Sequence, residues 1–125
     1  MNVILDAGAL IAIDRNDKSI AQLLVLARRN QARIFTTPPA VTQVWRNGAC
    51  QANLARALGV IETEPVGLNV AKRAGELLAA SNTSDAVDAL VALLVTPGDQ
   101  VWTSDPTDIH ALIQARNIPG QIVTV

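Results

Sequence analysis

Short apolar runs alternate with helix-periodic segments along the whole chain, and this alternation restricts the fold more than any other feature. Five runs rich in strand-forming residues are predicted as strands: 2–5, 33–36, 60–66, 100–103 and 121–125. Segments with apolar residues at helical spacing are predicted as helices: 9–13, 19–30, a stretch after Pro38-Pro39, 52–58, 68–80, 85–95 and 105–116. Because parallel strands need crossover connections, the pattern predicts a three-layer α/β/α sandwich around a central, mostly parallel five-stranded sheet.

Composition limits the function classes. A chain of 125 residues, half of them hydrophobic, suits a single folded domain spanning 1–125. Its only aromatic residues are Phe35, Trp45 and Trp102, which argues against a base-stacking platform, and the net charge of -1 supplies no overall basic field. The single cysteine, Cys50, excludes an internal disulfide, and no leader or membrane segment is recognisable. We therefore expect a soluble cytoplasmic protein with no membrane partner.

Three aspartates are predicted to meet at one edge of the sheet. Asp6 directly follows the strand 2–5, and Asp105 comes two residues after the end of the strand 100–103. Ligand sites of parallel sheets gather beyond the carboxyl ends of strands. Asp88 lies early in the helix 85–95, which is apolar on nearly every face and is therefore expected to be buried. A buried carboxylate is costly unless a cation or hydrogen-bond donors balance it. Convergence of the three would thus favour a divalent cation.

The residue types also point to the ion and the reaction. Oxygen-only ligands without a His or Cys cluster favour Mg²⁺ or Mn²⁺. Such ions activate water as a nucleophile and stabilise the attacking and leaving oxygens of an in-line displacement at a phosphodiester. We therefore predict phosphodiester hydrolysis, with Asp6, Asp88 and Asp105 as catalytic metal ligands. Asp85 and then Asp108 are further candidates for the metal.

Each acid also has a purely structural interpretation. Asp6 suits a helix N-cap, and Asp105-Pro106 followed by Asp108 forms a good capping arrangement. Asp85 would be favoured by the dipole of its helix. Asp88 is the least well explained in this way. For binding a phosphodiester substrate, the candidates are Arg46 for a phosphate, and Gln43 and Ser104.

Three segments resemble the acidic motifs of PIN-domain ribonucleases, in the family's order and spacing and across essentially the whole chain. The sequences are VILDAGAL from Val3, DAVDALVA from Asp85, and Thr103-Ser104-Asp105. The chain is most similar to the short bacterial VapC toxins, and Gln43 to Gly48 resembles actinobacterial members. The resemblance implies a Mg²⁺- or Mn²⁺-dependent endoribonuclease that dimerises and is silenced by a cognate antitoxin protein. Carried over by position, Asp6, Asp88 and Asp105 would bind the metal.

One departure keeps a second function class open. The family usually has a Glu on the helix after the second strand, where this chain has Gln43, a neutral amide. Losing a negative ligand should weaken a second metal more than the first, and Asp85 is our candidate for compensation. The alternative is a catalytically weak or inactive PIN domain that binds RNA or a protein. A phosphoacceptor receiver domain is a third interpretation, but it requires an acidic pair after the first strand and a late Lys, and no Lys follows Lys72.

Overall fold

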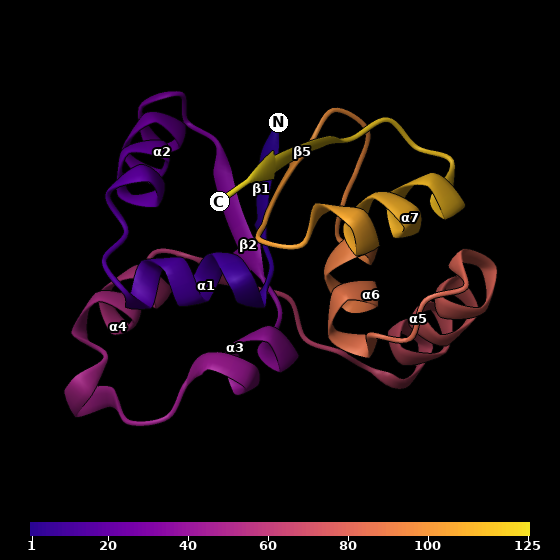
Figure 1. Cartoon of the computed structure of the whole chain (residues 1–125), viewed down its shortest axis with the longest axis horizontal. Coiled ribbons are helices and arrows are strands. Elements are labelled where there is room, and N and C mark those ends of the chain that lie inside the picture. Colours follow the sequence, from indigo (N-terminus) through magenta and orange to yellow (C-terminus); the bar gives the residue numbers. More distant parts are fainter.

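The computed structural model describes residues 1–125 and contains five strands, seven α-helices and one short 3₁₀ helix (Figure 1). The strands are β1 (Asn2–Leu5), β2 (Arg33–Thr36), β3 (Glu62–Thr63), β4 (Gln100–Thr103) and β5 (Gln121–Thr124). The helices are α1 (Ala7–Asp14), α2 (Lys18–Arg29), α3 (Pro38–Val44), η1 (Gly48–Cys50), α4 (Ala52–Leu58), α5 (Leu68–Ser81), α6 (Ala86–Leu93) and α7 (Pro106–Arg116). None of these helices is long and apolar enough to cross a lipid bilayer.

The strand order determines where a ligand site can form. The sheet runs β3-β2-β1-β4-β5, and every strand pair is parallel. The chain moves outward from β1 through β2 to β3, then crosses to the other side of β1 to build β4 and β5. This reversal between β1 and β4 is a topological switch point, beyond which ligands of open parallel sheets bind. The order differs from the 2-1-3-4-5 order of receiver domains, so that interpretation is wrong.

Helices cover both faces of the sheet, as predicted. Figure 1 shows α1, α2 and α4 on one side of the strands and α5, α6 and α7 on the other, with α3 between the two groups. Helix α3 contacts both α1 and α6. One hydrophobic core links the layers, and its largest fully buried side chains include Ile4, Leu5 and Leu10. The three-layer α/β sandwich is therefore confirmed, with a wholly rather than mostly parallel sheet.

Two predicted elements are shorter than expected. The strand predicted at 60–66 pairs only over Glu62–Thr63, because β2 offers few partners before Pro38 and because Pro65 has no N–H to donate. The helix predicted at 85–95 ends at Leu93. The Arg116 guanidinium donates to the carbonyls of Ala92 (2.7 Å) and Val95 (2.6 Å), which satisfies the end of the helix there.

Helix α6 is also less buried than its composition indicates. Ala89, Val91 and Ala92 are buried, whereas Val87 and Leu90 are only half-buried. Helix α6 contacts α3, α5 and α7, and this packing leaves Val87 and Leu90 partly accessible to solvent. The prediction of a central, fully buried helix was wrong, although its first turn still borders the core.

Hydrogen bonds fix the two chain ends at opposite edges of the sheet, the amino end near the start of β4 and the carboxyl end near the end of β4. The Asn2 N–H donates to Asp99 Oδ1 (2.8 Å), and Thr96 donates to the other oxygen through its N–H (2.8 Å) and hydroxyl (2.7 Å). Burial alone would favour the protonated form, but these hydrogen bonds hold the pKa of Asp99 below its usual value. At the other end, the Val125 N–H donates to the Thr103 carbonyl (2.9 Å).

Candidate active site

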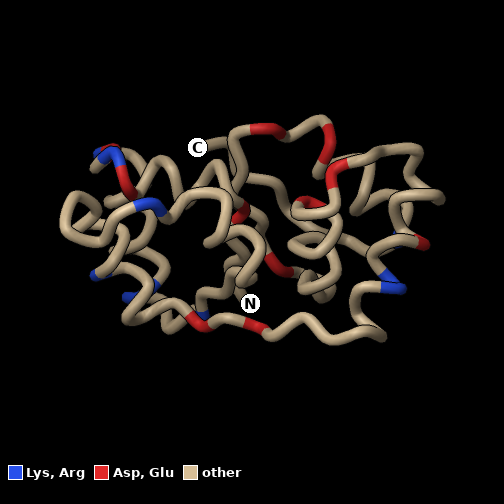
Figure 2. The backbone as a smooth tube through the Cα atoms, turned by 90° about the horizontal axis from the view of Figure 1, so that it is seen from below, with Lys and Arg blue, Asp and Glu red and all other residues tan.

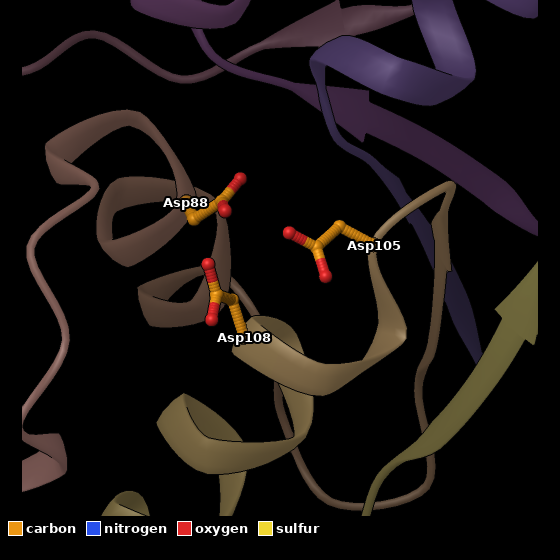
Figure 3. Close-up of side chains that lie close together, drawn as sticks. All are labelled: Asp88, Asp105 and Asp108. Carbon is orange, nitrogen blue, oxygen red and sulfur yellow. The ribbon is translucent and has the colours of Figure 1, made fainter.

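Three carboxylates converge beyond the switch point of the sheet. One oxygen each from Asp88, Asp105 and Asp108 lies within 4.8 Å of the others. Asp88 comes from the first turn of α6, Asp105 follows β4, and Asp108 comes from the first turn of α7. Figure 3 shows the three side chains pointing toward a common space. We call this group the acidic cluster.

Asp6 borders the acidic cluster from the end of β1. Its side chain is 3% exposed, and its Oδ1 accepts from the Ala9 N–H (2.8 Å), so Asp6 is the N-cap of α1. Burial raises the pKa of Asp6, the Thr103 hydroxyl and the N–H groups of Ala9 and Gly8 oppose this rise, and the charge of Asp105 adds to it. Asp6 therefore fulfils its structural role as a cap while its charge acts on the acidic cluster.

Asp88 has the most perturbed ionisation. Burial raises its pKa to about 7, and the charges of Asp85, Asp6, Asp105 and Asp108 add to the rise. Each of these four carboxylates disfavours the ionised form of Asp88. The convergence of Asp6, Asp88 and Asp105 predicted from sequence is thus visible in the electrostatics. Their role as metal ligands stays a prediction.

The capping role predicted for Asp105 and Asp108 is not observed. Asp105 precedes α7, yet its side chain makes no capping hydrogen bond to the helix. Instead its backbone N–H donates to the Thr103 hydroxyl (2.9 Å), and its carboxylate is turned toward Asp88 and Asp108. Pro106 at the start of α7 brings no N–H of its own, which reduces the need for a cap. Both carboxylates are therefore available to a ligand.

Asp85 has a different position from Asp108. It is the exposed N-cap of α6, and its Oδ1 accepts from the Asp88 N–H (3.0 Å). It lies outside the acidic cluster, although its charge acts on Asp88. Asp85 precedes the first helical residue and caps α6, in agreement with its structural interpretation as an acid favoured at the start of this helix.

None of the substrate-binding candidates belongs to the acidic cluster. Gln43 is exposed near the end of α3, a helix that contacts α6. The exposed Arg46 donates from one guanidinium nitrogen to the carbonyls of Thr42 (3.0 Å) and Trp45 (2.8 Å), which closes the end of α3. Binding of RNA by these two residues and by Ser104 stays a prediction.

The loop that carries Asp105 is held very close to α1. A Cβ built on Gly8 would collide with Ser104 Oγ and would lie 2.9 Å from Ser104 Cβ. Only glycine permits this approach without displacing the loop. Gly8 thereby lets the chain after β4 lie directly against the first turn of α1, beside Asp6.

Sequence reasoning missed two buried threonines that position the acids. The Thr36 hydroxyl donates to the Leu5 carbonyl (2.9 Å) and so fixes the end of β1 just before Asp6. Thr103 is fully buried, and its hydroxyl contacts Asp6 while accepting from Asp105. The available signal was a threonine that ends each of these two strands directly after two apolar residues. A hydroxyl at such a strand end can form hydrogen bonds with backbone groups beside a site.

No basic side chain neutralises these acids. The one ion pair of the chain joins Arg33 to Glu62 at an exposed edge of the sheet. Figure 2 shows acidic segments in the middle of the molecule and Lys and Arg mostly toward its two ends. Several carboxylates without a cationic partner form a donor set of hard oxygen ligands, which fits Mg²⁺ or Mn²⁺.

Comparison with known proteins found a solved structure that shares the fold of this chain. No protein-family model matches the chain, and no curated protein matches it. Among solved structures, the chain is similar to one in the crystal structure of VapBC2 from Rickettsia felis bound to a DNA fragment from their promoter. The TM-score is 0.69 with 14% sequence identity, covering 98% of this chain and 99% of the other. At this identity the likeness shows a shared fold.

Proposed function

We propose that this protein is a Mg²⁺- or Mn²⁺-dependent endoribonuclease and the toxin of a bacterial toxin-antitoxin pair. The observation that carries the proposal is the acidic cluster at the switch point of the sheet, with Asp6 beside it and no basic partner. The resemblance of the three acidic motifs to those of PIN domains, and the fold shared with a chain of a VapBC2 complex, support it.

Each residue of the site has a distinct role in the proposed reaction. A bound Mg²⁺ or Mn²⁺ would supply an activated water and stabilise negative charge on the phosphodiester. Asp88 and Asp105 would hold the ion directly, because they face each other across the acidic cluster. Asp6 would add negative charge from a rigid, buried position set by its bond to Ala9. Thr103 and Thr36 position these acids and take no part in the reaction.

Purified protein incubated with total bacterial RNA tests this proposal. We expect cleavage with Mg²⁺ or Mn²⁺, none with chelator, and none by Asp6→Asn. The introduced asparagine can still cap α1 through its amide oxygen, so the variant should keep its fold, which circular dichroism would check. A folded, partner-free protein that cuts no RNA with either ion would favour the alternative of an inactive RNA- or protein-binding module. The neutral Gln43, in place of the family's usual Glu, would then explain the loss of activity. The same preparation tests the expected homodimer by light scattering.

An apolar surface on α2, α4 and the residues just after α4 is available to a partner protein. We call Val25, Leu26, Ala57 and Val60 the α2–α4 groove; Val25, Leu26 and Val60 are each more than half exposed. Two adjoining depressions, of about 420 and 240 Å³, share Val25. Arg28, Arg29 and Arg56 line their sides. Apolar contact ringed by positive charge suits an amphipathic segment with acidic residues, which we assign to the antitoxin.

Charged substitutions in the α2–α4 groove test this assignment. We expect Val25→Asp/Val60→Asp to weaken binding of the protein encoded beside this one by at least about tenfold, because the new carboxylates would replace apolar contacts and repel the acidic residues of the bound segment. Leu68→Asp is the matched control, since Leu68 is a 71% exposed apolar residue on α5, across the sheet. Unchanged binding of the double variant, measured by calorimetry, would contradict the assignment.

A further inference from the structure

A shallow depression of about 410 Å³ lies between the start of α7 and the last strand. We call it the α7–β5 depression, and its lining consists of Pro106, Thr107, His110, Ile122 and Thr124. No carboxylate belongs to this lining, in contrast to the acidic cluster. The one histidine of the chain and two hydroxyl groups therefore meet on a surface without acids.

The α7–β5 depression and the acidic cluster share the start of α7. Asp105 and Asp108 belong to the acidic cluster, whereas Pro106, Thr107 and His110 line the depression. At 3.6 residues per turn, these two sets of residues lie on opposite sides of the helix start. A polymer strand that crosses the start of α7 would therefore contact both.

The polar side chains of the depression are available to a ligand. Thr107, His110 and Thr124 are exposed, and none of them forms a side-chain hydrogen bond or an ion pair within the chain. The imidazole offers a flat ring and two nitrogens, and each hydroxyl can donate and accept. The half-buried Pro106 and Ile122 add apolar surface. A flat ring, apolar surface and hydroxyl groups together suit a nucleobase and its ribose.

The charges of the acidic cluster make such a base contact valuable to an RNA strand. Contacts between basic side chains and phosphates usually dominate the affinity for nucleic acids. Here no basic side chain pairs with the acids, which repel the phosphates that flank the reacting one. Stacking of a base does not depend on phosphate charge and can supply affinity beside the acids.

We infer that the α7–β5 depression binds one unpaired nucleotide of the RNA, next to the phosphodiester that the acidic cluster would hold. The base would stack on His110, and the hydroxyls of Thr107 and Thr124 would bind the base edge and the ribose 2′-hydroxyl. The inference rests on the proposed function, since it concerns the same RNA. One imidazole is not the aromatic platform that the composition argues against. It serves a single base, which must be unpaired, so the inference predicts single-stranded RNA as the substrate.

Fluorescence anisotropy with a short labelled single-stranded RNA of mixed sequence tests the inference in chelator, where the RNA stays intact. We expect His110→Ala to weaken binding at least about fivefold, because the stacking of one base is lost. His110→Phe keeps a flat ring and should bind within about twofold of wild type. Gln114→Ala is the matched control, since Gln114 is an exposed residue of α7 outside the depression. In cleavage with Mn²⁺, His110→Ala should raise KM more than it lowers kcat.

The same RNA annealed to its complement provides a second measurement. Pairing hides the faces of the bases, so we expect wild type and His110→Ala to bind the duplex equally. An equal effect of His110→Ala on single-stranded and duplex RNA would overturn the inference, because the contact would then be to the backbone. Equal loss in His110→Ala and His110→Phe would also overturn it.

The remaining outcomes separate the inference from the proposed function. Wild-type RNA affinity in His110→Ala would overturn the inference and leave the proposed nuclease intact. If that variant instead bound the protein encoded beside this one more weakly, the depression would be a protein contact. RNA binding that depends on His110 without cleavage under Mn²⁺ would overturn only the nuclease. A wild type that neither binds nor cuts RNA would overturn both.

Discussion

Asp88→Asn is expected to reduce RNA cleavage by about 1000-fold without unfolding the protein. Lewis-acid stabilisation of a phosphoryl transition state supplies several kcal/mol, and each 1.36 kcal/mol corresponds to a tenfold change in rate. The introduced asparagine has the same shape as Asp88 but no charge, and the backbone N–H at this position can still donate to Asp85. Initial rates on a defined RNA substrate, with Mn²⁺ present in excess, would measure the loss.

Asp17→Asn is a suitable control for this substitution. Asp17 is an exposed N-cap of α2 whose Oδ1 accepts from the Ser19 N–H (2.8 Å), so the control makes the same chemical change at a residue outside the acidic cluster. Asn is an equally good cap, and we expect wild-type rates. Cleavage by Asp88→Asn at the wild-type rate would contradict the assignment of Asp88 to the reaction.

The metal-free protein is expected to lose stability as the pH rises from 5 to 8. Asp88 has a pKa of about 7 in the folded chain, against ~3.9 for an unperturbed Asp, so between these values the folded state binds more protons than the unfolded state. Stability then falls with rising pH, and the raised pKa of Asp6 acts in the same direction. Because Asp88 is half-exposed, we expect solvent screening to reduce its contribution to roughly 1 kcal/mol.

Urea unfolding at pH 5 and pH 8, with chelator and with Mn²⁺, would measure this dependence. Mn²⁺ should reverse the loss at pH 8, since an ion at 100 times its Kd stabilises the folded state by about 2.7 kcal/mol. Asp88→Asn should show a much smaller pH dependence in chelator. The lowered pKa of Asp99 acts below pH ~4, outside this window. Equal or greater stability of the metal-free wild type at pH 8 would contradict the expectation.

The sequence predicted the fold and the meeting of Asp6 with Asp105 because both follow from periodicity and parallel pairing. Strands β1 and β4 are neighbours, so the residues after them must lie at the same edge. The length of β3 was not predictable in this way, since an edge strand pairs only where its neighbour offers free backbone N–H and C=O groups. Its extent depends on Pro38 and Pro65, which come from different parts of the chain.

The direction in which the Asp108 side chain points could not be predicted from the sequence, for a different reason. Capping α7 and facing Asp88 differ by little more than side-chain torsions, and the same residues satisfy both patterns. The choice depends on where α6 places Asp88, which the packing of α5, α6 and α7 determines. Likewise the partial burial of α6 depends on how α3, α5 and α7 pack around it, which its apolar composition does not encode.

The contact between Val125 and Thr103 has a practical consequence for fusion proteins. Because β1 and β5 are parallel strands of one sheet, a segment attached before Asn2 leaves near Asp99, at the edge opposite the acids. A segment attached after Val125 leaves beside Thr103, two residues from Asp105. Under the proposed function, an affinity tag at the carboxyl end would therefore sit where an RNA strand would approach the acids, whereas a tag at the amino end would leave that approach clear.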